Sequence, residues 1–109
     1  MARLLYYGCS GDEVKSLQYW LNYISGTQRK SYLAVLDLTG DFDGFTFRRV
    51  VEFQWFSGMQ VKDGIVGPKT RVAIAKAAGI LLRDDGRLPP VPGSTDGLEM
   101  EHRSHRWSN

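Results

Sequence analysis

The acidic turn around Asp41 and Asp43 is the first place where residue types and spacing could support catalysis. Hydrolysis of a glycosidic bond needs two carboxyl groups held in one cleft, and these two aspartates stand two positions apart. Asp43, however, directly precedes a stretch with helical periodicity, and aspartate is among the best helix caps because its carboxylate accepts backbone N–H groups. We therefore interpret both as turn and cap residues. The alternative is that they line, with Asp63, a polar groove that recognises a ligand.

Histidines and the single cysteine are the remaining candidates for catalysis or metal binding. His102 and His105 lie three positions apart with two glutamates nearby, but they fall in a stretch with little apolar periodicity. Cys9 has no histidine close in sequence. A zinc site needs ligands held in place by folded structure, and an activated thiol needs a basic partner such as histidine. We therefore expect no enzyme, no metal site and no cofactor.

Aromatic side chains are better candidates for binding a ligand without catalysis. At about 100° per residue, Tyr19 and Tyr23 point away from Val14 on one predicted helix, and Trp55 points away from Val50 on the next. Flat aromatic surfaces suit sugar stacking or contact with another protein. Neighbouring segments could equally cover these rings.

Basic residues are spread over the first three quarters of the chain. Residues 1–83 hold 11 Lys and Arg against 7 Asp and Glu, whereas residues 84–109 hold 3 against 5. This field is too weak for nucleic acid, which demands a basic stripe, and no apolar run is long enough to span a membrane. Arg48, Arg49 and Lys62 could pair with the carboxylates of a ligand, or form a solvated face.

Hydrophobic periodicity predicts three helices, over about residues 12–24, 44–57 and 68–79. Gly26 is the expected stop of the first helix. Residues 32–38 are rich in apolar and β-prone residues and predict a strand or a hairpin arm.

The composition changes beyond Arg83. Residues 88–94 are rich in proline and form a polyproline-prone linker. We therefore expect one small domain over residues 1–83, followed by a linker and a flexible or partner-docked tail over residues 84–109.

Two phrases recur along the chain. Val-x-x-Leu-Gln at residues 14–18 returns as Val-x-x-Phe-Gln at residues 50–54, and the Gly-rich turn at residues 39–46 aligns with the turn at residues 63–70. Each turn leads directly into a predicted helix, so the repeated unit is a turn followed by a helix.

These motifs in order resemble the three-helix peptidoglycan-binding domain, a module often attached to bacterial and phage wall hydrolases. The resemblance covers roughly residues 4–78 and rests on Leu5-x-x-Gly8-x-x-Gly11-x-x-Val14-x-x-Leu17-Gln18-x-x-Leu21-Asn22, Thr46-x-x-x-Val50-x-x-Phe53-Gln54 and Asp63-Gly64-Ile65-Val66-Gly67-Pro68-Lys69-Thr70. It implies a mainly α fold, a compact three-helix bundle with Gly-rich turns and room for short β pairing. It also implies that Gln18 and Gln54 bond to loop backbone.

The resemblance implies non-covalent, non-catalytic binding to peptidoglycan, which would target an attached or associated assembly or hydrolase to the wall. The alternative is a structural or interaction protein that reuses the fold, such as a component of a phage or contractile tail-like particle. It would dock through the tail and the exposed aromatic residues. The chain begins at Met1 without a secretory signal. If the chain is complete, we expect it to act at the wall, in the periplasm or outside the cell, carried by such a particle.

Departures from the family pattern indicate where chemistry particular to this chain lies. The first turn has Asp43 where the family usually has glycine, and the segment over residues 27–42 is longer than in the most compact members. We expect the distinguishing contacts at Asp43, in this segment and in the tail.

Overall fold

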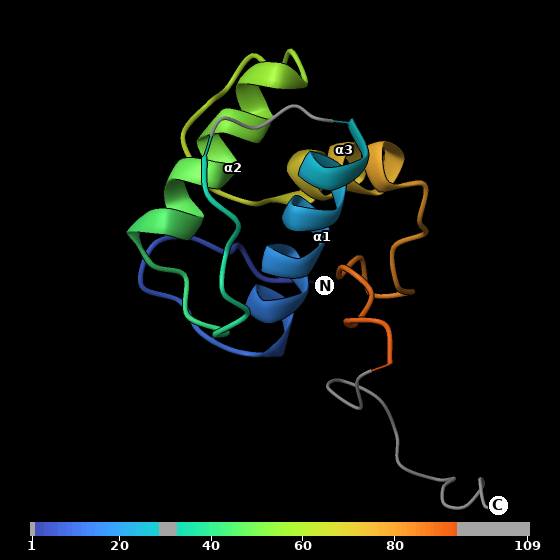
Figure 1. The fold of residues 1–109 in the computed structure, drawn as a ribbon. Coiled ribbons are helices and arrows are strands. Elements are labelled where there is room, and N and C mark those ends of the chain that lie inside the picture. The colour runs from blue at the N-terminus through green and yellow to red at the C-terminus, as the bar shows by residue number, and fades with distance from the viewer. Residues whose placement is uncertain (1, 29–32, 94–109) are drawn as a thin grey trace, which may run out of the picture.

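The computed structural model describes residues 2–28 and 33–93. This part of the chain folds into three helices, α1 (Asp12–Gln28), α2 (Gly44–Phe56) and α3 (Pro68–Ala78). Figure 1 shows α1 next to α2 and α3, with long loops joining them and the chain after α3 returning along α1. The expected mainly α, three-helix fold is confirmed.

Helix α1 is longer than predicted because Gly26 does not end it. The hydroxyl groups of Ser25 and Thr27 donate to the carbonyl oxygens of Leu21 and Tyr23, at 3.0 and 2.9 Å. A glycine inside a helix costs about 1 kcal/mol relative to alanine, and the helix continues past it to Gln28.

The other helix ends follow the predicted capping chemistry. Asp43 has extended backbone angles and its Oδ1 accepts a hydrogen bond from the Thr46 N–H at 2.9 Å. Helix α3 begins with Pro68 at its first position and ends at Gly79, which adopts φ +70°. Asp43 and Gly67 thus begin the two helices differently, the first with a side-chain cap and the second without one.

The predicted strand or hairpin arm over residues 32–38 is wrong for the described residues, 33–38. Figure 1 shows them as a stretched loop beside α1 and α2. β-prone residues favour an extended chain, but a strand also needs a partner backbone. Here the side-chain amide of Asn22 takes that place, bonding both the N–H and the carbonyl of Leu36 at 2.9 Å.

Short β pairing occurs elsewhere, as two isolated antiparallel bridges. Leu5 pairs with Val66, and Ser10 pairs with Asp41. The bridges bind the N-terminal segment to both Gly-rich turns.

The core draws on all three helices and on the segments that flank them. Its buried residues are Leu5, Val14, Leu17, Trp20, Leu21, Ile24, Leu36, Phe42, Val50, Phe53, Val66, Ile74 and Leu88. Among the described residues, no helix combines the length and apolarity needed to cross a bilayer.

The segment after α3 packs against α1. Leu88 is only 2% exposed, its N–H donates to Glu13 Oε2 at 2.9 Å, and Trp20 Nε1 donates to the Pro89 carbonyl at 2.9 Å. The domain boundary at residue 83 stays a prediction, but Leu88 and Pro89 lie against α1. The expected tail from residue 94 onward, with His102 and His105, lies outside the described residues.

Candidate functional site

The first Gly-rich turn is fastened to α1 by the buried side chain of Gln18. Its Oε1 accepts the Gly40 N–H at 3.0 Å, and its Nε2 donates to the Asp41 carbonyl at 2.9 Å and to Thr46 Oγ1 at 3.0 Å. A buried amide that satisfies both its oxygen and its nitrogen within one turn fixes the conformation of that turn.

Gln54 fastens the second turn with the same set of bonds. Its Oε1 accepts the Gly64 N–H at 2.9 Å, and its Nε2 donates to the Ile65 carbonyl at 3.1 Å and to Thr70 Oγ1 at 3.2 Å. The loop-fastening role predicted for both glutamines is confirmed.

The three candidate aspartates lie on these turns and line no common cavity in the described part of the chain. The Asp43 carboxylate is engaged in the cap of α2, and Asp63 Oδ1 accepts the Ile65 N–H at 3.0 Å. Asp41 contributes its backbone, donating its N–H to Thr39 Oγ1 at 3.1 Å. Their roles in ligand binding stay predictions.

The candidate aromatics occupy two places. Tyr19 and Tyr23 stack with ring centroids 6.5 Å apart on α1, and Trp20 meets both edge-on. Trp55 lies on the outer face of α2, 65% exposed, with Lys62 Nζ 4.5 Å from its ring centroid. Tyr23 and Trp55 are exposed as predicted, whereas Tyr19 is half-buried against the core.

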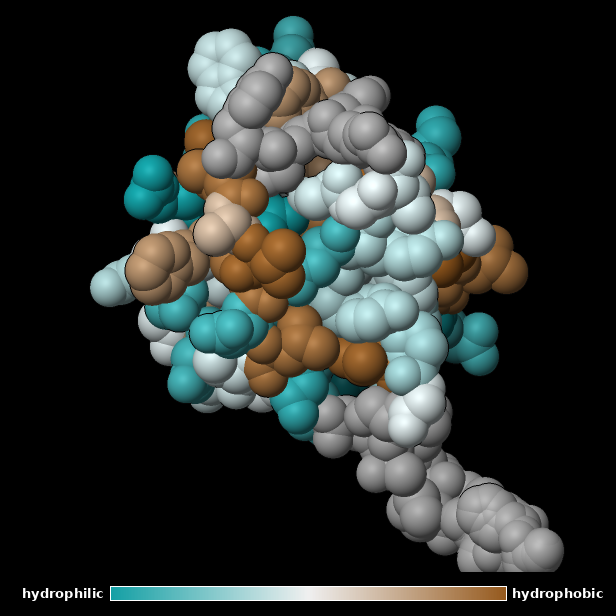
Figure 2. Space-filling view, in the orientation of Figure 1, coloured by the Kyte–Doolittle hydropathy of each residue, from teal (hydrophilic) through white to brown (hydrophobic). Residues whose placement is uncertain are grey.

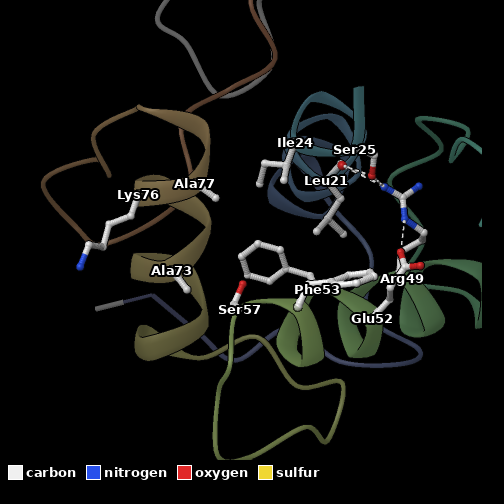
Figure 3. A pocket seen from close by; sticks show the side chains of 11 residues that line it. Leu21, Ile24, Ser25, Arg49, Glu52, Phe53, Ser57, Ala73, Lys76 and Ala77 are labelled. Atoms are coloured by element: carbon white, nitrogen blue, oxygen red, sulfur yellow. Dashed lines mark hydrogen bonds and ion pairs between the residues drawn. The ribbon is translucent and has the colours of Figure 1, made fainter. Parts of the chain in front are cut away.

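A groove of about 400 Å³ lies between the three helices. In Figure 3, Ala73 and Ala77 face it from α3, Leu21 and Ile24 face it from α1, and Phe53 forms its floor. The small alanine side chains leave this space open. Its apolar floor and nearby hydroxyl groups could hold the face of a sugar ring or a small apolar side chain.

The two candidate arginines differ in burial. Arg48 is exposed, whereas Arg49 is buried, because neighbouring helical residues are turned by about 100°. Burial lowers the pKa of the Arg49 guanidinium from its ordinary value, and the carboxylate of Glu52 opposes this shift. The guanidinium of Arg49 bonds to the Leu21 and Ala34 carbonyls, Ser25 Oγ and Asn22 Oδ1, and lies 3.6 Å from Glu52 Oε1.

A second hollow, of about 350 Å³, lies where residues 33–39 cross the first turns of α2. It brings together three of the candidate residues, Asp43, Arg48 and Arg49. Sequence reasoning missed Phe45, which also lines it. The available signal was an apolar residue in the first helical turn, next to a segment already marked as longer than usual.

Three helices with two glutamine-fastened turns define a class of small α-helical domains. The chain belongs to the peptidoglycan binding domain family, whose model matches residues 10–74. The matched part includes both fastened turns, all of α1 and α2, and the first half of α3.

A solved structure has the same fold. It is the crystal structure of a periplasmic domain of the EpsAB fusion protein of the Vibrio vulnificus type II secretion system, with a TM-score of 0.52. The sequences are 21% identical, and the match covers 92% of this chain and 45% of that one, so this chain spans less than half of that structure. This likeness concerns the fold alone. No protein with curated annotation matches the chain significantly.

Proposed function

We propose that this chain binds bacterial peptidoglycan non-covalently and without catalysis. The observation that carries the proposal is membership of the peptidoglycan binding domain family over residues 10–74. Peptidoglycan as the ligand places the action at the cell wall or in the periplasm.

The chemistry of the turns supports binding without catalysis. The carboxylates of Asp43 and Asp63 accept backbone N–H groups, which holds the turns in shape. A general acid for glycan hydrolysis would instead point into a cleft opposite a second carboxyl group, whereas Asp43 and Asp63 line two different hollows.

The interhelical groove and the exposed rings offer surfaces for a sugar–peptide polymer. Tyr23 and Trp55 present flat apolar faces to solvent, and aromatic faces stack on the apolar faces of sugars. Phe53, Ala73 and Ala77 line a hollow of ligand size.

Co-sedimentation with purified peptidoglycan sacculi tests this function. The protein should enter the pellet at low salt, and the turbidity of the sacculi should stay constant on prolonged incubation. Cellulose particles serve as a control for unspecific sedimentation. Recovery of the protein in the supernatant with sacculi would contradict binding, and falling turbidity would contradict the absence of catalysis.

We further propose that wall binding brings an associated hydrolase or particle to the wall. A fluorescent protein fused to this chain should then decorate isolated cell envelopes. The alternative is a structural component of a phage or contractile tail-like particle, in which the exposed aromatic side chains dock to other proteins. Envelopes that stay dark while the fusion co-purifies with particles would favour that alternative.

A further inference from the structure

Over residues 34–37, one backbone edge is occupied, and the other makes no hydrogen bond in the described part of the chain. The Ala34 carbonyl accepts a hydrogen bond from Arg49. The N–H and the carbonyl of Leu36 are both bonded to the side-chain amide of Asn22. Val35, by contrast, makes no backbone hydrogen bond within the described residues, and neither does Asp37. Since alternate residues of an extended chain direct these groups to opposite edges, the open edge resembles that of an unpaired strand.

The 350 Å³ hollow beside this segment is apolar and open to solvent. Val35 is 78% exposed and Phe45 is 70% exposed, and both line it. Figure 2 shows hydrophobic side chains gathered on the face that residues 33–39 cross. Large exposed apolar side chains beside a hollow mark a binding surface more often than scattered single residues do.

Of the charged residues that line the hollow, one of each sign is exposed. The Arg48 guanidinium and the Asp37 carboxylate are exposed and line it, and neither has an ion-pair partner in the described part of the chain. The Asp43 carboxylate is already committed to the helix cap. The fitting ligand therefore carries a carboxylate for Arg48 and an ammonium group for Asp37.

We propose that this hollow binds the peptide stem of peptidoglycan rather than its glycan, a proposal that rests on the proposed function. A stem peptide supplies amide groups in a row for the open edge at Val35 and Asp37, in the manner of an added strand. Its alanine methyl groups fit the apolar hollow, its carboxylate pairs with Arg48, and the amino group of its diamino acid pairs with Asp37. Neutral acetylated glycan offers neither the ammonium group nor a peptide strand.

The segment is held in place before any ligand arrives. Asn22 and Arg49 anchor it from two helices, and Leu36 is buried beneath it. Binding therefore does not have to order the loop, which would otherwise weaken the affinity.

Amide NMR of the full chain with two soluble probes tests the proposal. One probe is the synthetic stem tetrapeptide L-Ala-γ-D-Glu-diaminopimelate-D-Ala, and the other is an uncharged, peptide-free oligomer of N-acetylglucosamine. The tetrapeptide should shift the amides of Val35, Asp37 and Phe45 and slow hydrogen exchange at Val35 and Asp37.

Arg48→Ala should weaken tetrapeptide binding about tenfold, because it removes a charge-assisted contact. Lys69→Ala, which also removes one exposed positive charge, should bind like the unmodified chain. Because Arg48 is exposed, we expect the Arg48→Ala variant to fold, and circular dichroism checks this.

The outcomes separate this proposal from the broader function. If the protein sediments with sacculi but only the glycan probe shifts its amides, or Arg48→Ala binds the tetrapeptide unchanged, the stem-peptide site is wrong while wall binding stands. If it does not sediment with sacculi and neither probe shifts its amides, both proposals are wrong.

Discussion

Glu13 on α1 and Arg71 on α3 form a buried two-pronged ion pair, with Nε–Oε2 at 2.7 Å and Nη2–Oε1 at 2.8 Å. The same carboxylate accepts the Leu88 N–H, and Arg71 also donates to the Arg3 carbonyl. One pair thus joins the N-terminal segment, two helices and the segment after α3.

Glu13→Ala should lower the free energy of unfolding by about 3–5 kcal/mol, because it leaves the buried guanidinium without its counter-charge. Urea unfolding followed by circular dichroism measures this. Asp12→Ala removes an exposed carboxylate from the same helical turn and should cost at most about 1 kcal/mol. Equal losses for the two variants would contradict the role of the ion pair.

Gln18→Ala and Gln54→Ala should each destabilise the chain by about 2–3 kcal/mol, since each leaves buried backbone groups of one turn unsatisfied. The effect should be local. Hydrogen exchange should accelerate at the Gly40 amide in the first variant and at the Gly64 amide in the second. These amides donate their hydrogen bonds to Gln18 and Gln54, respectively. Gln60→Ala, at an exposed position, is the control. Exchange that rises equally at both glycines in either variant would argue against separate fastening.

Gly64→Ala should be more harmful than Gly58→Ala. Both glycines have positive φ, +76° and +70°, where a Cβ costs about 1–2 kcal/mol. At Gly64 the added Cβ would also lie 2.3 Å from Phe47 Cε1, whereas at Gly58 it meets open space. The melting temperature should therefore fall further for Gly64→Ala, and equal melting temperatures would show that the Phe47 ring moves aside freely.

Leu88→Ala should cost about 2–4 kcal/mol, because a buried leucine leaves a cavity when it is truncated. Leu81→Ala is the matched control, since Leu81 is 87% exposed and exposed substitutions stay within about 0.5 kcal/mol. Thermal unfolding compares the two. An unchanged stability of Leu88→Ala would mean that residues 84–93 behave as the free linker that composition suggested.

Trp55→Ala should reduce sedimentation with sacculi severalfold while leaving the fold intact, if the exposed ring contacts the wall. Tyr7→Ala removes a ring of equal exposure, 65%, that no candidate site contains. The bound fraction at a series of sacculus concentrations gives the comparison. A loss of the same size in both variants would point to unspecific adhesion of aromatic surface.

The sequence was sufficient for features whose causes are local or repeated. Periodicity placed the three helices, and the chemistry of Asp43 placed the start of the second one, because a cap is satisfied within a few residues of itself. The recurring glutamine, together with the family resemblance, predicted that a glutamine side chain bonds to the backbone of each turn. The predicted helix stop at Gly26 was wrong, because a glycine weakens a helix without ending it when the hydrogen bonds of neighbouring residues persist.

Three features were decided by tertiary structure alone. They are the burial of one of two adjacent arginines, the loop conformation of residues 33–38 and the position of Leu88. Arg49 bonds to Leu21, 28 residues away, Glu13 reaches Arg71 and Leu88 across 58 and 75 residues, and none of these partners lies within a helical turn. The chain itself determined which elements form and how they begin. Only the folded molecule determined which polar groups are buried together, because each such group takes the partner that packing brings to it.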